Sequence, residues 1–97
     1  MGCTERLICC DVHYSGHVQG VGFRYTTLSI AKKYAVTGYV QNLPDGRVHL
    51  VAEGPADEVE ALLSAVADSM QDRIRDIHCQ HLHPTGGFSR FKIQHEL

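Results

Sequence analysis

The pattern of hydrophobic and polar positions along the chain predicts strands and helices in a definite order. Short apolar or alternating runs predict strands at about 6–14, 39–43, 47–53 and 74–83, and a short last strand around Phe91 and Ile93. Apolar positions three and four residues apart predict a helix over about 22–35 and a second one beginning at 54–58. Pro55 is expected at the first position of the second helix, and Lys32 and Lys33 in the last turn of the first.

This order, β-α-β-β-α-β with one added strand, indicates an α+β fold of the ferredoxin-like, split βαβ type. We expect an antiparallel sheet with both helices on one face. Right-handed crossovers would set the first strand beside the third, with the second strand outside the third. Pro44, Asp45 and Gly46 predict a tight turn that pairs the second and third strands.

The segment 15–24, Ser-Gly-His-Val-Gln-Gly-Val-Gly-Phe-Arg, lies where the first strand meets the first helix. Glycines there allow backbone N–H groups to turn toward one ligand at a helix N-terminus, which favours an anion. Arg24 would add a planar, two-pronged donor for oxygen atoms. The spacing fits neither a Walker loop nor a dinucleotide fingerprint. On glycine spacing alone, an ordinary crossover turn with a solvated arginine explains the segment about equally well.

Asn42 is expected near this loop, because it lies late in the second strand and just before the hairpin turn. Two interpretations remain open at this point. Asn42 is either a polar partner of the loop or a turn-flanking asparagine that bonds its own backbone, which is the commoner role.

Length and charge narrow the class of protein. The 97 residues, with 43% hydrophobic content, predict a single domain over 1–97. A net charge of −2 argues against a nucleic-acid or membrane partner, since both favour a basic face. Sheet-bound RNA would need paired aromatic residues on the central strands, where only Tyr14 is available. Without a predicted leader or apolar span, the expected location is the cytoplasm.

Cysteine and histidine residues offer a second possible chemistry. The four cysteines, at positions 3, 9, 10 and 79, include two neighbours and no Cys-x-x-Cys pair, so reduced thiols are expected. Cys79, His81 and His83 would share one face of the fourth strand and are a candidate soft-metal set. A half-buried thiol with two surface imidazoles is the simpler interpretation, because no fourth ligand is evident.

Two linked motifs resemble the signatures of the acylphosphatase family. The first is Gly16-His-Val-Gln-Gly-Val-Gly-Phe-Arg24, and the second is Gly38-Tyr-Val-Gln-Asn42, followed by Gly46, Val48 and Gly54. The similarity extends over essentially the whole chain. It implies the ferredoxin-like fold that the order of elements predicts.

The resemblance also implies a function. A member of this family would hydrolyse the carboxyl–phosphate bond of acyl phosphates to a carboxylate and inorganic phosphate, without metal or cofactor, and we expect a monomer. By correspondence, Arg24 would hold the phosphoryl oxygens and Asn42 would position the attacking water. The phosphate cradle would be the backbone N–H groups of His17, Val18, Gln19, Gly20 and Val21.

Two points bear on this hypothesis. Leu43 and Arg47 stand where related sequences often have hydroxyl residues, which leaves open how Asn42 is supported. His17 is interpreted as an exposed loop residue and not as an acid catalyst. The alternative function is a non-catalytic ferredoxin-like module that binds a phosphorylated or carboxylate metabolite through the same loop.

Overall fold

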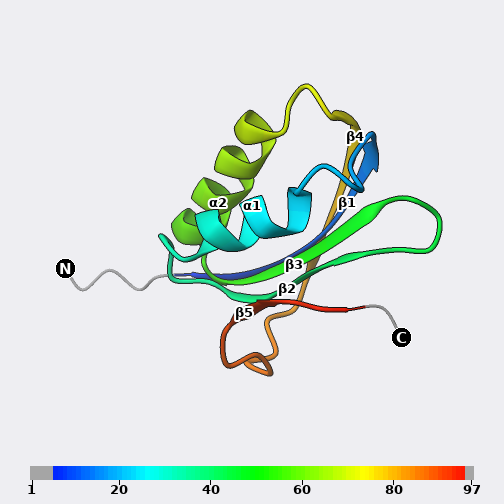
Figure 1. Cartoon of the computed structure of the whole chain (residues 1–97). Helices are drawn as coiled ribbons and strands as arrows, with labels where there is room; N and C mark the ends of the chain where they lie inside the picture. Colours follow the sequence, from blue (N-terminus) through cyan, green and yellow to red (C-terminus); the bar gives the residue numbers. More distant parts are fainter. Residues whose placement is uncertain (1–5, 96–97) are drawn as a thin grey trace.

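The computed structural model describes residues 6–95, which form one sheet with two helices on one of its faces (Figure 1). The sheet has five strands in the order β4-β1-β3-β2-β5. The elements are β1 (Leu7–Gly16), α1 (Phe23–Ala31), β2 (Thr37–Asn42), β3 (Val48–Pro55), α2 (Ala56–Ser69), β4 (Ile74–Leu82) and β5 (Phe91–Ile93). The predicted ferredoxin-like arrangement, with β1 beside β3 and β2 outside β3, is therefore confirmed.

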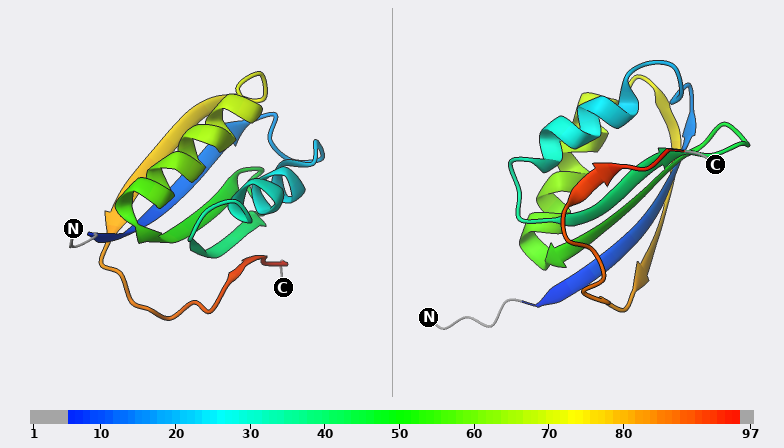
Figure 2. Two further views of the ribbon diagram at one scale, coloured as in Figure 1. Left: turned by 90° about the vertical axis from the view of Figure 1, so that its left-hand side faces the viewer. Right: turned by 60° about the horizontal axis from the view of Figure 1, so that its bottom comes forward.

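The sheet differs from the prediction in one respect, because it is mixed and not wholly antiparallel. Strands β1 to β4 pair antiparallel, whereas β5 pairs parallel to β2, with Tyr39 opposite Lys92. The connection after β4 passes around the end of the sheet before it reaches β2, so β5 enters in the direction of β2 (Figure 2).

The core lies between the sheet and the helices. Alternate residues of β1 and β3, including Val12 and Leu50, point toward the helices and are almost completely buried. The apolar stripe of α2 packs on them through Val59, Leu62 and Val66, as its spacing predicts. The Tyr14 and Phe23 rings pack at a centroid distance of 4.9 Å, so the end of β1 is held to the start of α1.

Helix α1 ends at Ala31, earlier than predicted, and Lys32 and Lys33 therefore do not lie in its last turn. The N–H of Lys33 donates to the Ile30 carbonyl, three residues back, and this tighter pattern closes the helix. The Ala35 N–H then donates to the Glu58 side chain at 2.7 Å. The tertiary contact to α2 explains why the chain leaves the helix although Tyr34 continues the apolar spacing.

Smaller differences occur at other element ends. β1 continues to Gly16 through an irregular register after Ser15. Pro55 is the residue before α2 and not its first helical residue, while Asp57 and Glu58 occupy the first turn as expected. Neither helix of the described residues is long and apolar enough to cross a membrane. Of the four cysteines, Cys9, Cys10 and Cys79 are free thiols, and Cys3 lies outside the described residues.

Candidate functional site

The loop between β1 and α1 is shaped by glycines in the left-handed region. Gly20 and Gly22 have φ values of 77° and 79°, and Gly22 is the residue that caps α1. The Val18 side chain is only 1% exposed and belongs to the core, so it fixes the middle of the loop. The loop therefore presents backbone near the N-terminus of a helix, where N–H groups and the helix dipole favour an anion.

His17 begins this loop and changes one detail of the expected cradle. Its side chain is exposed, as predicted, but its N–H donates to the Arg73 carbonyl at 2.8 Å. That N–H is engaged in holding the loop to the start of β4. Of the amides predicted for the cradle, that of His17 is therefore already bonded within the protein.

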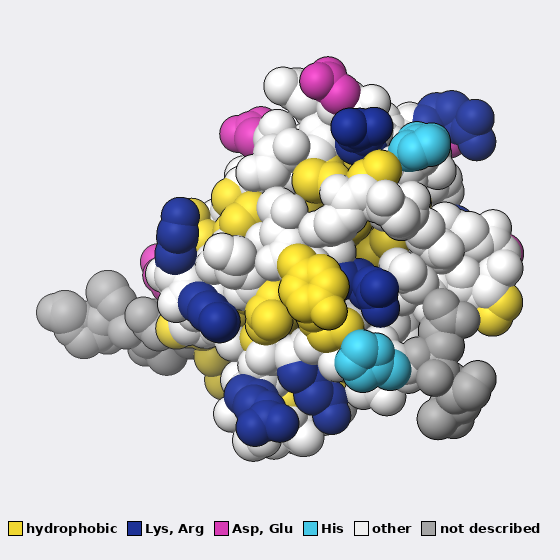
Figure 3. All heavy atoms as spheres, viewed as in Figure 1, with side chains coloured by type: hydrophobic (Ala, Val, Ile, Leu, Met, Phe, Trp, Pro, Cys, Tyr) yellow, Lys and Arg dark blue, Asp and Glu magenta, His cyan; other side chains and the backbone are white. Residues whose placement is uncertain are grey.

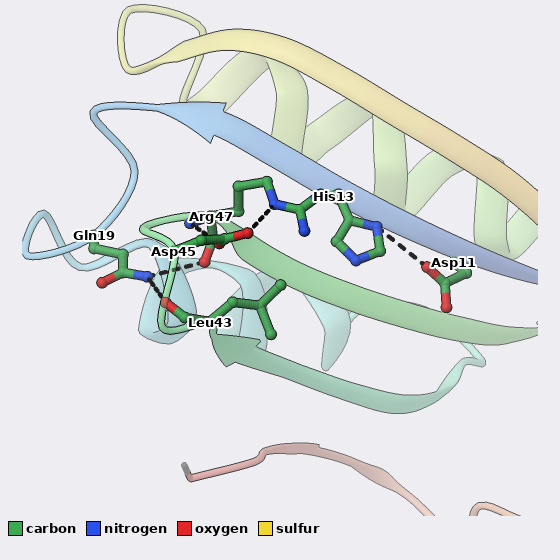
Figure 4. Close-up of polar contacts among 6 residues, drawn as sticks. All are labelled: Asp11, His13, Gln19, Leu43, Asp45 and Arg47. Carbon is green, nitrogen blue, oxygen red and sulfur yellow. Dashed lines mark hydrogen bonds and ion pairs between the residues drawn. The ribbon is translucent and has the colours of Figure 1, made fainter.

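Gln19 connects the loop to the β2–β3 hairpin (Figure 4). Its side-chain Nε2 donates to the Leu43 carbonyl at 2.8 Å and to the Arg47 carbonyl at 2.9 Å. Leu43 directly follows Asn42, so these two bonds hold the glycine loop against the end of β2. From the sequence, only the backbone N–H of Gln19 was expected to act, and nothing in its motif signals this side-chain role.

Asn42 is the last residue of β2, opposite Val48, and is half-buried. Within residues 6–95 its side chain makes no hydrogen bond to another protein group. The turn is closed instead by Asp45, which accepts from the Arg47 N–H at 3.1 Å and from Arg47 Nε at 2.8 Å. The Arg47 N–H is the main cause of the lowered pKa of Asp45. Asn42 is therefore not needed to bond the turn.

Arg24 lies in the first turn of α1 and is half-buried. In the part of the chain that the structure describes, no carboxylate lies within ion-pair distance of its guanidinium, and the first turn of α1 holds no acidic residue. On the face shown in Figure 3, Lys and Arg side chains are spread across the surface and acidic ones lie toward its edges. A guanidinium without an ion-pair partner among the described residues suits an anionic ligand.

Comparison with known families assigns the chain as a whole. A sequence model described as Acylphosphatase matches residues 10–93, which include both motifs, both helices, strands β2 to β5 and all of β1 except its first three residues. The chain belongs to the acylphosphatase family. The predicted family is therefore confirmed, and so is the predicted enzyme class, a hydrolase acting on acid anhydrides.

Individual relatives agree with this assignment. An acylphosphatase from Methanospirillum hungatei is 40% identical over 84 residues, covering 84% of this chain and 91% of that protein. The crystal structure of acylphosphatase from Bacillus subtilis superposes with a TM-score of 0.80 at 33% identity and covers 90% of this chain and 98% of its own. An acylphosphatase from Coxiella burnetii superposes with a TM-score of 0.78 at 28% identity, covering 91% and 93%.

A polar cluster on the opposite face of the sheet does not belong to the loop site. The His13 and His49 rings stack at 4.4 Å, and the Asp11 carboxylate lies 3.4 Å from His13 Nδ1 and 3.1 Å from His49 Nε2. Burial, and after it the His49 charge, lowers the pKa of His13. Sequence reasoning missed this cluster. Tyr14, the aromatic residue considered for RNA binding, is buried among the core residues and offers no ring on either face.

Proposed function

We propose that this acylphosphatase-family chain hydrolyses the carboxyl–phosphate bond of acyl phosphates to a carboxylate and inorganic phosphate. In this proposal Arg24 and the N–H groups of residues 18–21 hold the phosphoryl group, and Asn42 positions the attacking water. The chief support is the double hydrogen bond of Gln19, which links the loop to the residue after Asn42. It also gives Asn42 a means of support that does not depend on the Leu43 and Arg47 side chains.

The chemistry needs few groups beyond these. An acyl phosphate is a mixed anhydride, and its carboxylate leaving group needs little protonation. Phosphoryl transfer passes through a loose transition state with charge spread over the equatorial oxygens, so donors and positioning provide most of the catalysis. One preorganised donor contributes about 3–4 kcal/mol to the transition state, and orienting the water contributes part of roughly 7–11 kcal/mol. Arg24 and the loop amides supply the first effect, and Asn42 supplies the second.

We expect loose selectivity for the acyl group. A shallow hollow of about 430 Å³ begins at Gly16 and His17 and is otherwise lined by Asp72, Arg73, Ile74 and Arg75. Most of these side chains are exposed. A surface of this kind does not enclose a particular acyl chain, which supports comparable rates with acetyl and benzoyl phosphate.

The proposal includes a monomer that acts in the cytoplasm as one domain. All the residues assigned to the site come from one chain, and the three described cysteines are free, which suits a reducing compartment. Size-exclusion chromatography with light scattering tests the monomer.

Phosphate release from acetyl and benzoyl phosphate, with EDTA present, tests the function. We expect fast hydrolysis by the wild type and near-complete loss in Arg24→Ala and Asn42→Ala. The exposed Arg90→Ala and the half-buried Gln41→Ala, one residue before Asn42, are matched controls that should keep wild-type rates. A folded wild-type protein that binds phosphate but does not hydrolyse acyl phosphates would refute the proposed enzymatic activity. It would support the alternative, a metabolite-binding module.

A further inference from the structure

Three soft or borderline metal ligands converge at the edge of the sheet, on the side that faces the helices. The two thiol sulfurs of Cys10 and Cys79 and a ring nitrogen of His81 all lie within 4.8 Å of one another. Cys10 lies directly opposite His81 across the β1–β4 pair, and Cys79 is two residues before His81 on β4. Side chains at these positions share one face because a strand alternates its faces residue by residue.

This set differs from the one that the sequence suggested. His83 lies beyond the last residue of β4, and Cys10 from the neighbouring strand takes its place beside Cys79 and His81. The exchange replaces an imidazole with a second thiol. Ligands from two paired strands also come closer together than alternate residues along one strand.

The surroundings of the cluster suit a bound cation. Cys10 is only 2% exposed, whereas Cys79 and His81 are exposed, so an ion can reach the cluster from solvent. The side chains of the exposed pair can rotate to close the site. Two sulfurs on one tetrahedral Zn²⁺ lie about 3.8 Å apart, given Zn–S bonds of about 2.3 Å, so only a small contraction is required.

The cluster supplies three ligands, so a tetrahedral ion would take its fourth ligand from solvent. Three protein ligands with water in the fourth position form an ordinary zinc coordination sphere.

We propose that Cys10, Cys79 and His81 bind a thiophilic cation, with Zn²⁺ as the expected ion, and that this ion cross-links the edge strand β4 to β1. The site lies apart from Asn42, since β1 and β3 separate β4 from β2 in the sheet. Its role is to stabilise the edge of the sheet. Figure 2 shows β4 running beside β1 along this edge, with α2 on the same side of the molecule.

Binding is tested on the full chain, reduced and stripped of metal, by titration with Co²⁺ followed by competition with Zn²⁺. We expect one equivalent of Co²⁺ to give the near-ultraviolet charge-transfer band of thiolate–cobalt bonds and the visible bands of a tetrahedral site. Zn²⁺ should displace it and raise Tm by at least about 5 °C. Absence of the thiolate–cobalt band would overturn the proposal.

Variants assign the ligands. Cys79→Ser should weaken the band, since only the Cys10 thiol remains, and His81→Ala should weaken Co²⁺ binding more than about 10-fold; both positions are exposed, so the variants should fold. The matched controls are Cys9→Ser, His83→Ala and Cys3→Ser, which should bind as the wild type does. A band as strong in Cys79→Ser as in the wild type, or one that disappears in Cys3→Ser, would place the ion elsewhere and refute the assignment.

Hydrolysis of acetyl phosphate separates this site from catalysis. Rates with and without saturating Zn²⁺ should agree within about 2-fold, since no group assigned to phosphoryl binding belongs to the cluster. A large change in rate would contradict the separate role proposed for the ion. An inactive wild type that still shows the cobalt band would refute the proposed hydrolase activity and leave the metal site intact.

Discussion

The side chain of Gln19 and the carbonyl of Leu43 are joined by a 2.8 Å hydrogen bond across 24 residues of sequence. The same Nε2 donates to the Arg47 carbonyl, so one amide group spans both arms of the hairpin. Because both acceptors are backbone atoms, the link does not depend on which side chains occupy positions 43 and 47. The glycine loop and the end of β2 are thereby held together by a contact that substitution at either position would leave in place.

Loss of this link should lower turnover more than it lowers folding stability. In Gln19→Leu the loop keeps its Val18 anchor in the core, but its alignment with Asn42 is no longer enforced. A misalignment of about 1 Å can cost on the order of 10²-fold in rate. We expect kcat on acetyl phosphate to fall at least about 10-fold, and the free energy of unfolding by only about 1–2 kcal/mol. Gln41→Leu is the matched control, and an equal loss of kcat there would show that the effect is unspecific.

Substitutions of Arg24 and of Asn42 should change different kinetic constants. Arg24→Ala removes a donor to the phosphoryl oxygens, so we expect kcat/KM to fall at least about 10²-fold and inhibition by inorganic phosphate to weaken with it. Arg24→Lys should recover little, because an ammonium group lacks the planar two-pronged geometry. Steady-state kinetics with phosphate as a competitive inhibitor measure both quantities.

Asn42→Ala should instead spare phosphate binding. The proposed role of Asn42 is to orient water, which matters for the reaction and not for holding the product. We expect kcat to fall about 10²-fold while the inhibition constant for phosphate changes by less than about 3-fold. If kcat fell and the inhibition constant for phosphate rose by a similar factor, Asn42 would be a phosphate ligand and the water-positioning role would be wrong.

Sequence alone predicted the features that depend on local periodicity. The α2 stripe of Val59, Leu62 and Val66 and the turn at Asp45 follow from spacing within one element or between neighbours, and the positions of β1, β2 and β3 follow from the order of elements. The features that it missed depend on partners far along the chain. Glu58 captures the Ala35 N–H and ends α1 early. A strand of three residues, β5, has too few positions for its direction to be inferred.

The site was predicted in the same uneven way. Arg24 and Asn42 were proposed as site residues from the two motifs, because their chemistry goes with residue type and spacing. The engaged N–H of His17 and the side-chain bonds of Gln19 could not be found, since their acceptors lie far away in sequence. The exchange of His83 for Cys10 has the same origin, because it depends on the register between β1 and β4.

Gly38 should be intolerant of any side chain. A Cβ atom there would lie 1.9 Å from the Val51 carbonyl oxygen of the paired strand, and its φ of +135° is itself unfavourable for other residues. Gly38→Ala should lower the free energy of unfolding by more than about 3 kcal/mol. Gly46→Ala is the matched control: its φ is +95°, but no atom lies within 4 Å of the added Cβ, so only about 1–2 kcal/mol should be lost. Urea denaturation compares the two, and equal losses would show that the close approach to Val51 is not decisive.

Tyr14 should make the fold sensitive to alkali. Burial, and after it the neighbouring Cys79 and Cys10 thiols, raises the pKa of its hydroxyl above the ordinary value of about 10. At a pH between the ordinary pKa, which applies to the unfolded chain, and the raised pKa of the folded chain, the Tyr14 hydroxyl keeps its proton only in the folded chain. The stabilisation is therefore complete below about pH 10 and declines above it, by up to about 1.4 kcal/mol per pH unit.

Urea unfolding at about pH 8 and about pH 11 tests this sign. Tyr14→Phe should reduce the loss of stability at high pH, because phenylalanine has no proton to release. Tyr25→Phe is the control, since that ring is 65% exposed and should leave the pH dependence unchanged. An identical alkaline loss in wild type and Tyr14→Phe would mean that other groups govern it and that the buried hydroxyl contributes nothing measurable.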